Sequence, residues 1–341
     1  MAIQDKTYFK AFDGLRGLAA IAVALLHWLL SFVGYLAVDF FLVLSGFILA
    51  HRYLYAASPV SSGKFVLSRF ARLYPMHLFG LLSYTLAHRL LVKDIPRYPD
   101  GTLFTLLQQL TLTHNIGLNS HGQTWNVPSW SISMEFWLNV LFFCCIHRNT
   151  SSLPLLLISV IGLTVIYNLT GHIDTTYQNY FQIANSGLLR GWSSFVLGII
   201  AYRGWRLART IEWPPLILLL AKCVICISAL ALLFARSGNL SLLDIFAPIA
   251  FTALVVELAL EQGILAWLVA KLQWLGTISY SIYLNHLIIL MVIDCGLVHL
   301  SLSHVQLTPL YLGGLLAYFA ITYRRVETAG KRLITKLSIT C

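Results

Sequence analysis

Charged residues are scarce in this sequence of 341 residues. Aspartate, glutamate, lysine and arginine make up 11% of the chain, whereas 58% is hydrophobic. A water-soluble protein of this length could not cover its surface with so few charges, so the composition excludes a soluble globular protein. Acidic residues are scarcer than basic ones: 13 aspartates and glutamates stand against 23 lysines and arginines, which leaves a formal net charge of +10.

The sequence also lacks the polar and apolar alternation that marks the strands of a membrane β-barrel. It contains continuous apolar runs instead, such as LPLLLISVIGLTVIYNL (153–169), which is long enough to form a membrane-spanning helix. We therefore predict an all-α, polytopic transmembrane protein, with one integral-membrane domain over residues 1–341 and about ten spans. The predicted spans lie near 13–33, 35–53, 73–92, 131–147, 153–169, 188–203, 214–235, 242–260, 277–298 and 306–323.

Lysine and arginine are distributed unevenly over the predicted loops. With the N-terminus in the cytoplasm, 18 of the 23 basic residues lie on the cytoplasmic side and five, Arg190 among them, on the other. Because short cytoplasmic loops carry the excess of positive charge, we predict that both termini are cytoplasmic. The basic character then follows from membrane insertion and does not require a nucleic-acid partner.

Metal-binding patterns are missing as well. Only six cysteines occur, and most of them fall inside predicted spans, Cys144, Cys145, Cys223 and Cys226 among them, where cysteine usually acts as a small apolar residue. Neither CVIC (223–226) nor the histidines have further ligands at a suitable spacing, and catalytic zinc normally takes three protein ligands. We therefore predict no metal site.

The first predicted span nevertheless contains ionisable side chains, in the stretch FDGLRGLAAIAVALLHW (12–28). Such residues are costly in lipid and commonly functional. Arg16 and His27 are eleven residues apart, so they share one helix face at a separation of about 16 Å, and Asp13 can pair with Arg16. An imidazole can take a proton from a hydroxyl group near neutral pH. The alternative is that Arg16 only reaches the lipid headgroups and His27 only bonds a neighbouring helix.

This segment resembles the opening helix of the acyltransferase-3 family, bacterial integral-membrane enzymes that acylate envelope and exported glycans. That helix carries a basic residue, ten intervening residues and a histidine, as Arg16 and His27 do here. RRVETAGKRL (324–333) resembles the family's usual ending, although Ala329 stands where proline is common. Four more blocks are similar and in the same order: VDFFLVLSGFILAHRY (38–53), RFARLYP (69–75), WSISMEFW (130–137) and SYSIYLNH (279–286).

The resemblance implies an O-acyltransferase of a bacterial cytoplasmic membrane. It would use acyl-CoA, most simply acetyl-CoA, as donor and a glycan or glycolipid hydroxyl as acceptor. In this scheme His27 is the general base and Arg16 orients the donor or stabilises charge. Glu135 supports the acceptor or the histidine.

The coenzyme A phosphates need a cationic site on the cytoplasmic side. Arg69 and Arg72 lie one helical turn apart in the predicted cytoplasmic layer, and a guanidinium group suits phosphate oxygens, while Lys64 adds a point charge. Contact with anionic lipids is the alternative role for these residues.

The same family blocks suggest substrate contacts, although each of these residues could equally serve packing. Gly14 and Gly17, by contrast, are predicted to permit close helix packing. The suggested substrate-binding residues are Asp39, Ser45, Trp130, Tyr283 and His286.

Three other functions remain possible. The same fold could transfer succinyl or longer acyl chains, the protein could carry a glycolipid or acyl donor across the membrane without reacting it, or it could be a non-catalytic scaffold. A transporter is disfavoured because the sequence shows no internal repeat. The enzymatic hypothesis requires a water-accessible passage from the inner membrane surface to His27.

Overall fold

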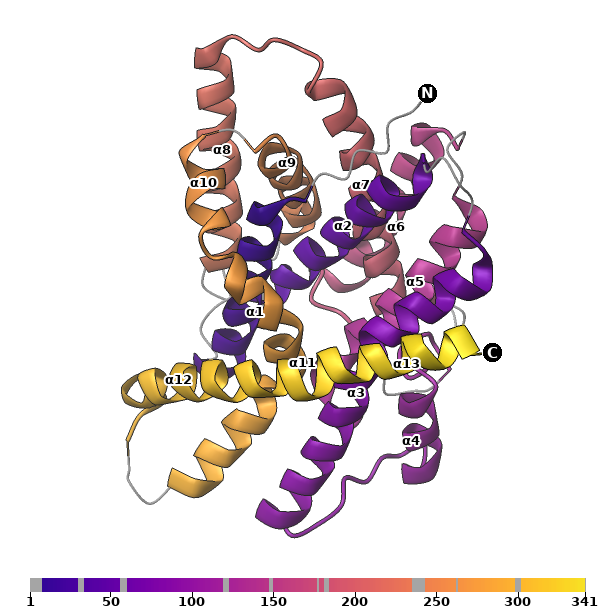
Figure 1. The fold of residues 1–341 in the computed structure, drawn as a ribbon, viewed down its shortest axis with the longest axis vertical. Helices are drawn as coiled ribbons and strands as arrows, with labels where there is room; N and C mark the ends of the chain where they lie inside the picture. The colour runs from indigo at the N-terminus through magenta and orange to yellow at the C-terminus, as the bar shows by residue number, and fades with distance from the viewer. Residues whose placement is uncertain are drawn as a thin grey trace.

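The structure is a computed structural model, and it describes residues 8–29, 34–55, 60–118, 123–146, 150–176, 178–180, 184–234, 243–261, 263–297 and 302–340. The described residues are predominantly helical (Figure 1). The helices are α1 (Lys10–Leu29), α2 (Ala37–Leu49), α3 (Ser62–Leu91), α4 (Thr102–Leu110), α5 (Trp130–Cys145), α6 (Ser152–Thr170), α7 (Ser186–Ala208), α8 (Pro215–Phe234), α9 (Ala247–Ala259), α10 (Ile264–Ala270), α11 (Gln273–Leu297), α12 (His304–Thr322) and α13 (Ala329–Thr340).

Two very short strands, β1 (Asn179–Tyr180) and β2 (Ala184–Asn185), precede α7 and pair antiparallel. The predicted all-α class therefore holds except for this pair of strands. Asn185 ends β2 and also caps α7, because its side chain accepts a hydrogen bond from the Leu188 amide at 3.1 Å.

Each of the ten predicted spans overlaps a helix, but fewer helices have the length and apolarity of a span. Among the described residues, five segments are long and apolar enough to cross a membrane, and the bent pair Asp244–Ala259 and Ile264–Ala270 would make a sixth. The number of about ten spans stays a prediction, as do the cytoplasmic termini. The five segments are Lys10–Leu29, Gly34–Leu54, Ser152–Thr170, Gln273–Leu297 and His304–Lys336.

Two predicted spans fall short for identifiable reasons. Helix α5 has only 16 residues, and the part of α3 in the predicted span 73–92 contains Pro75, His77, His88 and Arg89, which lower its apolarity. The predicted orientation counts three basic loop residues that lie outside the described residues: Lys6, Arg148 and Arg236.

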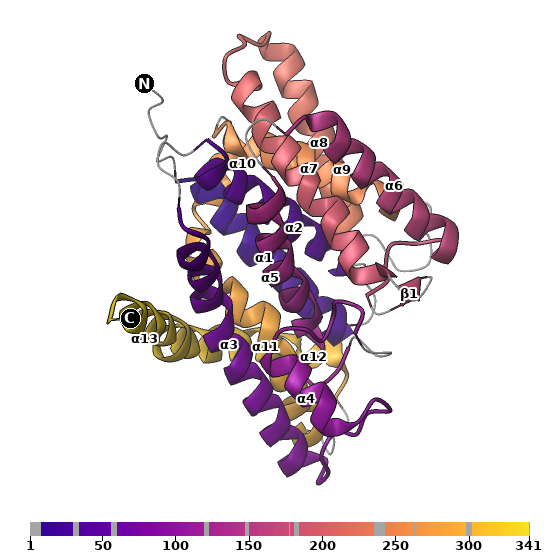
Figure 2. The same cartoon turned by 90° about the vertical axis from the view of Figure 1, so that its right-hand side faces the viewer.

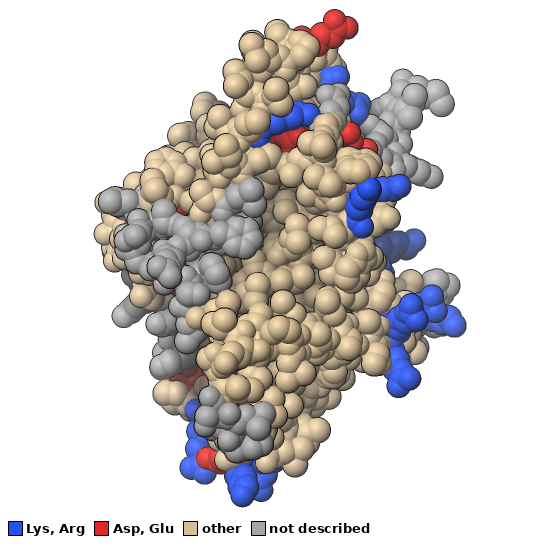
Figure 3. Space-filling view, turned by 90° about the vertical axis from the view of Figure 1, so that its left-hand side faces the viewer, with Lys and Arg blue, Asp and Glu red and all other residues tan. Residues whose placement is uncertain are grey.

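The helices are arranged around α1, which packs most extensively against α11, while α2 packs against α7. Helices α6 to α9 lie together on one side of this centre, and α3, α4 and α13 on the other (Figure 2). In Figure 1 the C-terminal helices α12 and α13 cross the others at a steep angle. Figure 3 shows a broad face without charged side chains, which gather at its margins. Such a distribution suits contact with lipid.

Glycines set the closest helix contacts, as predicted for Gly14 and Gly17. A Cβ atom on Gly14 would lie 1.9 Å from the Val269 carbonyl oxygen, and one on Gly17 would lie 2.2 Å from Leu275 Cβ. Between α2 and α7, a Cβ atom on Gly198 would lie 1.9 Å from the Val43 carbonyl oxygen. Only glycine permits these backbones to approach so closely.

We predict that Gly198→Ala destabilises the protein by about 1–3 kcal/mol, because the added methyl group forces α2 and α7 apart. Gly204→Ala is the matched control on the same helix, since no atom lies within 4 Å of the position its Cβ would take. Thermal denaturation in detergent, followed by size-exclusion chromatography, compares the two. Equal melting temperatures would contradict close packing at Gly198.

Candidate active site

A cavity of about 270 Å³ lies between α1, α2, α3, α5, α11 and the C-terminal helices. We call it the arginine cavity, because Arg16 and Arg72 both line it. It is also lined by Lys331 and by two carboxylates, Glu135 and Glu327. The cavity therefore combines cationic groups suited to an anionic ligand with acids that balance part of their charge.

The polar residues of the arginine cavity are held by short-range contacts. Arg16 Nη1 lies 3.5 Å from Asp13 Oδ1, which confirms the predicted pair. Ser45 Oγ donates to Glu135 Oε1 at 3.2 Å, so these two predicted site residues are brought together. Glu135 thus lines the cavity together with Arg16 and Arg72.

Only one member of the predicted phosphate-binding set lines this cavity. Arg72 does so, whereas Lys64 is exposed in the first turn of α3. Arg69 is buried beside Phe65, with its guanidinium carbon 5.8 Å from the ring centroid and its Nε donating to Ser68 Oγ at 3.4 Å.

A second cavity, of about 220 Å³, contains the side chain of His27, and we call it the histidine cavity. His27 lies in the last turn of α1 and is half-buried. Trp130 and Arg190 line the same cavity, together with Gln123 and Asp174 from the loops before α5 and after α6. These polar side chains, placed among apolar ones, suit a hydroxylated ligand.

His27 is held by a second histidine. Nε2 of His286 lies 3.0 Å from Nδ1 of His27, which is also 3.0 Å from the Val23 carbonyl oxygen. Nδ1 of His286 lies 2.8 Å from the Tyr283 carbonyl oxygen.

This hydrogen-bond pattern assigns the protons for neutral rings. A carbonyl can only accept, so His286 carries its proton on Nδ1 and accepts on Nε2. His27 Nδ1–H then donates to His286 and to the Val23 carbonyl. The Nε2 atom of His27 is left without a proton, which is the state that a general base requires. In the sequence analysis Glu135 was the candidate for orienting His27. The structure places His286 in that position and Glu135 in the other cavity.

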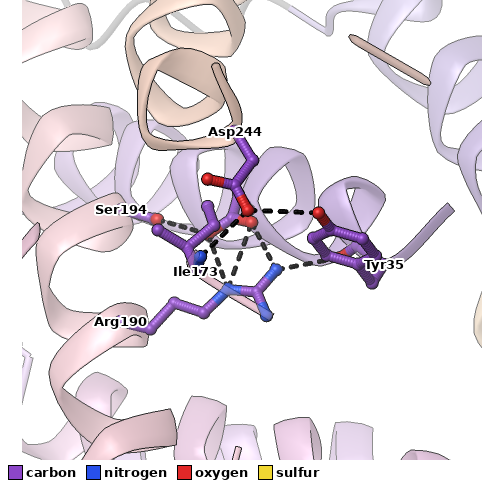
Figure 4. A network of polar contacts seen from close by, with 6 residues as sticks. Tyr35, Ile173, Arg190, Ser194 and Asp244 are labelled. Carbon is purple, nitrogen blue, oxygen red and sulfur yellow. Dashed lines mark hydrogen bonds and ion pairs between the residues drawn. The ribbon is translucent and has the colours of Figure 1, made fainter. Parts of the chain in front are cut away.

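A buried ion pair supports the histidine cavity (Figure 4). Arg190 on α7 donates from Nε to both carboxylate oxygens of Asp39 on α2 at 3.2 Å, and from Nη2 to Asp39 and to the Tyr35 carbonyl. Ser194 Oγ also donates to Asp39, at 2.8 Å. Asp244 accepts from the Tyr35 hydroxyl and from the Ile173 amide, which attaches the loop after α6.

Arg190, counted among the basic residues of the outer side, falls near the start of the predicted span 188–203, and the structure places it in α7. The side chain is fully buried within α7, because Asp39 supplies the countercharge that a buried guanidinium needs. Asp39, a predicted substrate-binding residue, is also fully buried, and both of its oxygens are bonded to Arg190 or Ser194. Asp39 therefore acts on the cavity through Arg190.

The two cavities share a wall formed by Val38 and Tyr283, which line both. Tyr283 is fixed there by a 2.7 Å hydrogen bond between its hydroxyl and Ser131 Oγ and by edge-on contact with Phe41. The predicted passage from Arg16 to His27 is thus divided into two adjoining cavities.

Sequence reasoning missed the role of Arg190, although one signal was present. A single arginine followed by the apolar run of a predicted span requires a carboxylate in a neighbouring span, and Asp39 is such a carboxylate. Among the described residues, no group of three His, Cys, Asp or Glu side chains is placed to bind a metal ion.

A family model described as an acyltransferase domain matches residues 9–323. The chain belongs to the acyltransferase-3 family. Its match to the family and its apolar helices fit a multi-pass membrane protein. No solved structure matches the chain.

For three relatives of this acyltransferase, the aligned region covers different shares of this chain and of the relative. "Protein 2 in picA locus" of Rhizobium radiobacter is 33% identical over 45% of this chain and 90% of its own. "Putative membrane-bound transacylase BcsY" of Komagataeibacter xylinus is 27% identical over 80% of this chain and 71% of its own. The peptidoglycan O-acetyltransferase OatA of Listeria monocytogenes is 25% identical over 83% of this chain but only 49% of its own.

We predict that His286→Leu lowers the rate of acyl transfer on the order of 10²-fold, because the His27 ring loses the partner that fixes its orientation and tautomer. His286→Gln should recover part of this loss, since its side-chain carbonyl can accept the His27 proton. The measurement is the initial rate of acyl transfer in membranes, normalised to folded protein. His88→Leu, which changes a half-buried histidine on α3 that lines neither cavity, serves as control, and a full rate in His286→Leu would contradict the assignment.

Proposed function

We propose that this acyltransferase is an O-acyltransferase of a bacterial cytoplasmic membrane. It moves an acyl group, most simply acetyl, from acyl-CoA to a hydroxyl of an envelope or exported glycan or glycolipid. One observation carries the proposal: a cavity lined by arginines adjoins a cavity lined by a histidine with a basic Nε2, and the two share the wall of Val38 and Tyr283.

Acyl-CoA occupies the arginine cavity in this proposal. Coenzyme A is strongly anionic and its pantetheine arm is long and narrow. Arg72 and Lys331 meet the phosphates, and Arg16, which lines the same cavity, orients the donor. A cavity of about 270 Å³ is too small for the whole coenzyme, so it holds the arm, and the nucleotide lies outside it.

Transfer takes place at the shared wall. The acceptor hydroxyl, bound in the histidine cavity, gives its proton to His27 Nε2 as its oxygen attacks the thioester carbonyl carbon. The carbon–sulfur bond then breaks, and the coenzyme A thiolate takes the proton from His27. Ester and free thiol are the products, and the imidazole returns to its starting state.

The names of the relatives support the acetyl group and the glycan acceptor. One is named as a peptidoglycan O-acetyltransferase and one as a membrane-bound transacylase. The polar lining of the histidine cavity, with Gln123 and Asp174 contributed by loops, is compatible with a sugar that has several hydroxyls.

We predict that His27→Ala abolishes the labelling of glycan when membranes containing the protein receive radiolabelled acetyl-CoA. The physical reason is the loss of the base that deprotonates the acceptor, an effect of about 10²–10⁴-fold. Undiminished labelling would remove His27 from the mechanism. Movement of glycolipid without release of coenzyme A thiol, by wild-type protein, would favour a transporter.

We predict separately that Arg72→Ala raises the KM for acetyl-CoA by about 10–10²-fold with little change in kcat, because a hydrogen bond to a charged phosphate is lost. Lys64→Ala is the matched control on the same helix, since Lys64 lies outside the cavity. An unchanged KM in Arg72→Ala would contradict the donor site.

A further inference from the structure

Arg190 has a part of its hydrogen-bonding capacity that the ion pair does not use. A guanidinium group has five N–H donors in a rigid plane. Nε and Nη2 of Arg190 bond Asp39 and the Tyr35 carbonyl, whereas Nη1 is buried and has no hydrogen-bond partner among the described residues. In Figure 4 the nitrogen without a dashed line points away from Asp244 and Tyr35.

The position of Nη1 matters because Arg190 lines the histidine cavity together with His27. A buried donor is normally paired, so an unpaired one on a side chain that lines a cavity indicates a ligand acceptor atom. The same guanidinium lies 5.9 Å from the Trp130 ring centroid and 5.7 Å from that of Tyr35, and these rings restrict its movement.

The electrostatics of the pair select the kind of acceptor. Asp39 neutralises the Arg190 charge, and the carboxylate-bearing Asp174 lines the same cavity as Arg190 and His27. The histidine cavity is therefore poorly suited to a phosphate, which carries permanent charge. It suits a neutral carbonyl oxygen that becomes negative only during reaction, because a fixed donor then strengthens its bond as charge develops.

We propose that Arg190 Nη1 is the donor that stabilises the oxyanion formed on the acyl carbonyl oxygen during transfer. This inference rests on the proposed function. When the acceptor oxygen attacks the acyl carbon, its proton passes to His27 Nε2. The carbonyl π electrons move to the carbonyl oxygen, and this oxygen accepts a hydrogen bond from Arg190 Nη1–H. When the carbonyl re-forms, the carbon–sulfur bond breaks, and the thiolate leaves with the proton from His27. Asp39 is then a positioning residue, since it acts through Arg190.

The alternative is that Arg190 and Asp39 only join α7 to α2. A charge-neutral replacement separates the two roles, because a buried ion pair can be exchanged for apolar residues of similar volume with little loss of stability. In the double variant Asp39→Leu/Arg190→Met the helices stay joined but Nη1 is gone. Arg203→Met is the matched control on α7, since Arg203 bonds Ser152 and lines neither cavity.

The experiment measures release of coenzyme A thiol from acetyl-CoA in native membranes that contain the endogenous acceptor. For the double variant we expect kcat to fall about 10²–10³-fold, with the KM for acetyl-CoA within a few-fold of wild type. A folded double variant that keeps the wild-type kcat would overturn the inference. Wild-type protein that releases no coenzyme A would instead refute the proposed function.

A second measurement covers the case in which the double variant does not fold. Arg190→Lys keeps the charge beside Asp39 but cannot place a planar donor at the same point. The inhibitors are a CoA trifluoromethyl ketone, whose hydrate mimics the oxyanion, and a CoA thioether without the carbonyl. The measured quantity is the ratio of the inhibition constant of the thioether to that of the ketone. We expect this ratio to fall at least tenfold in Arg190→Lys and to keep its wild-type value in Arg203→Met. An unchanged ratio in Arg190→Lys would contradict an oxyanion contact.

Discussion

The arrangement of this protein depends on a buried charge that must be neutralised. Arg190 has no access to solvent, and an unpaired guanidinium in such a place would be prohibitively costly. Asp39 therefore has to lie beside it, which fixes α2 against α7, and Gly198 makes the backbone approach possible. Through Tyr35, Asp244 and the Ile173 amide, the same contacts fix the loop that carries Asp174. The histidine cavity is thus shaped by an ion pair.

The two ends of α1 serve the two cavities. Arg16, near its start, lines the arginine cavity, and His27, in its last turn, lines the histidine cavity. Because α11 packs along α1, His286 can reach His27 while Tyr283, one turn earlier, stands between the cavities. In the proposed mechanism, this pair of helices supplies the base, its orienting partner and Tyr283, one of the two residues of the shared wall.

Much of this could be predicted from local pattern. Apolar runs predicted the helices, and the spacing of Asp13, Arg16 and His27 predicted that they share one helix face. The ordered sequence blocks predicted the family, which the comparison confirms. Contacts between distant segments could not be predicted. Arg190 and Asp39 are 151 residues apart and His286 and His27 are 259 apart, so only the packing of the helices brings them together. Lys64 was grouped with Arg69 and Arg72 by proximity in sequence, but helix α3 turns only Arg72 toward the cavity.

The wall of Val38 and Tyr283 has a consequence for the membrane itself. A continuous water-filled bore from one surface to the other would conduct protons and dissipate the electrochemical gradient that the membrane maintains. The ring of Tyr283 and the side chain of Val38 line both cavities, so they lie between any water in one cavity and any water in the other. In the proposed mechanism, the acyl group would pass this wall without a continuous water column that could conduct protons.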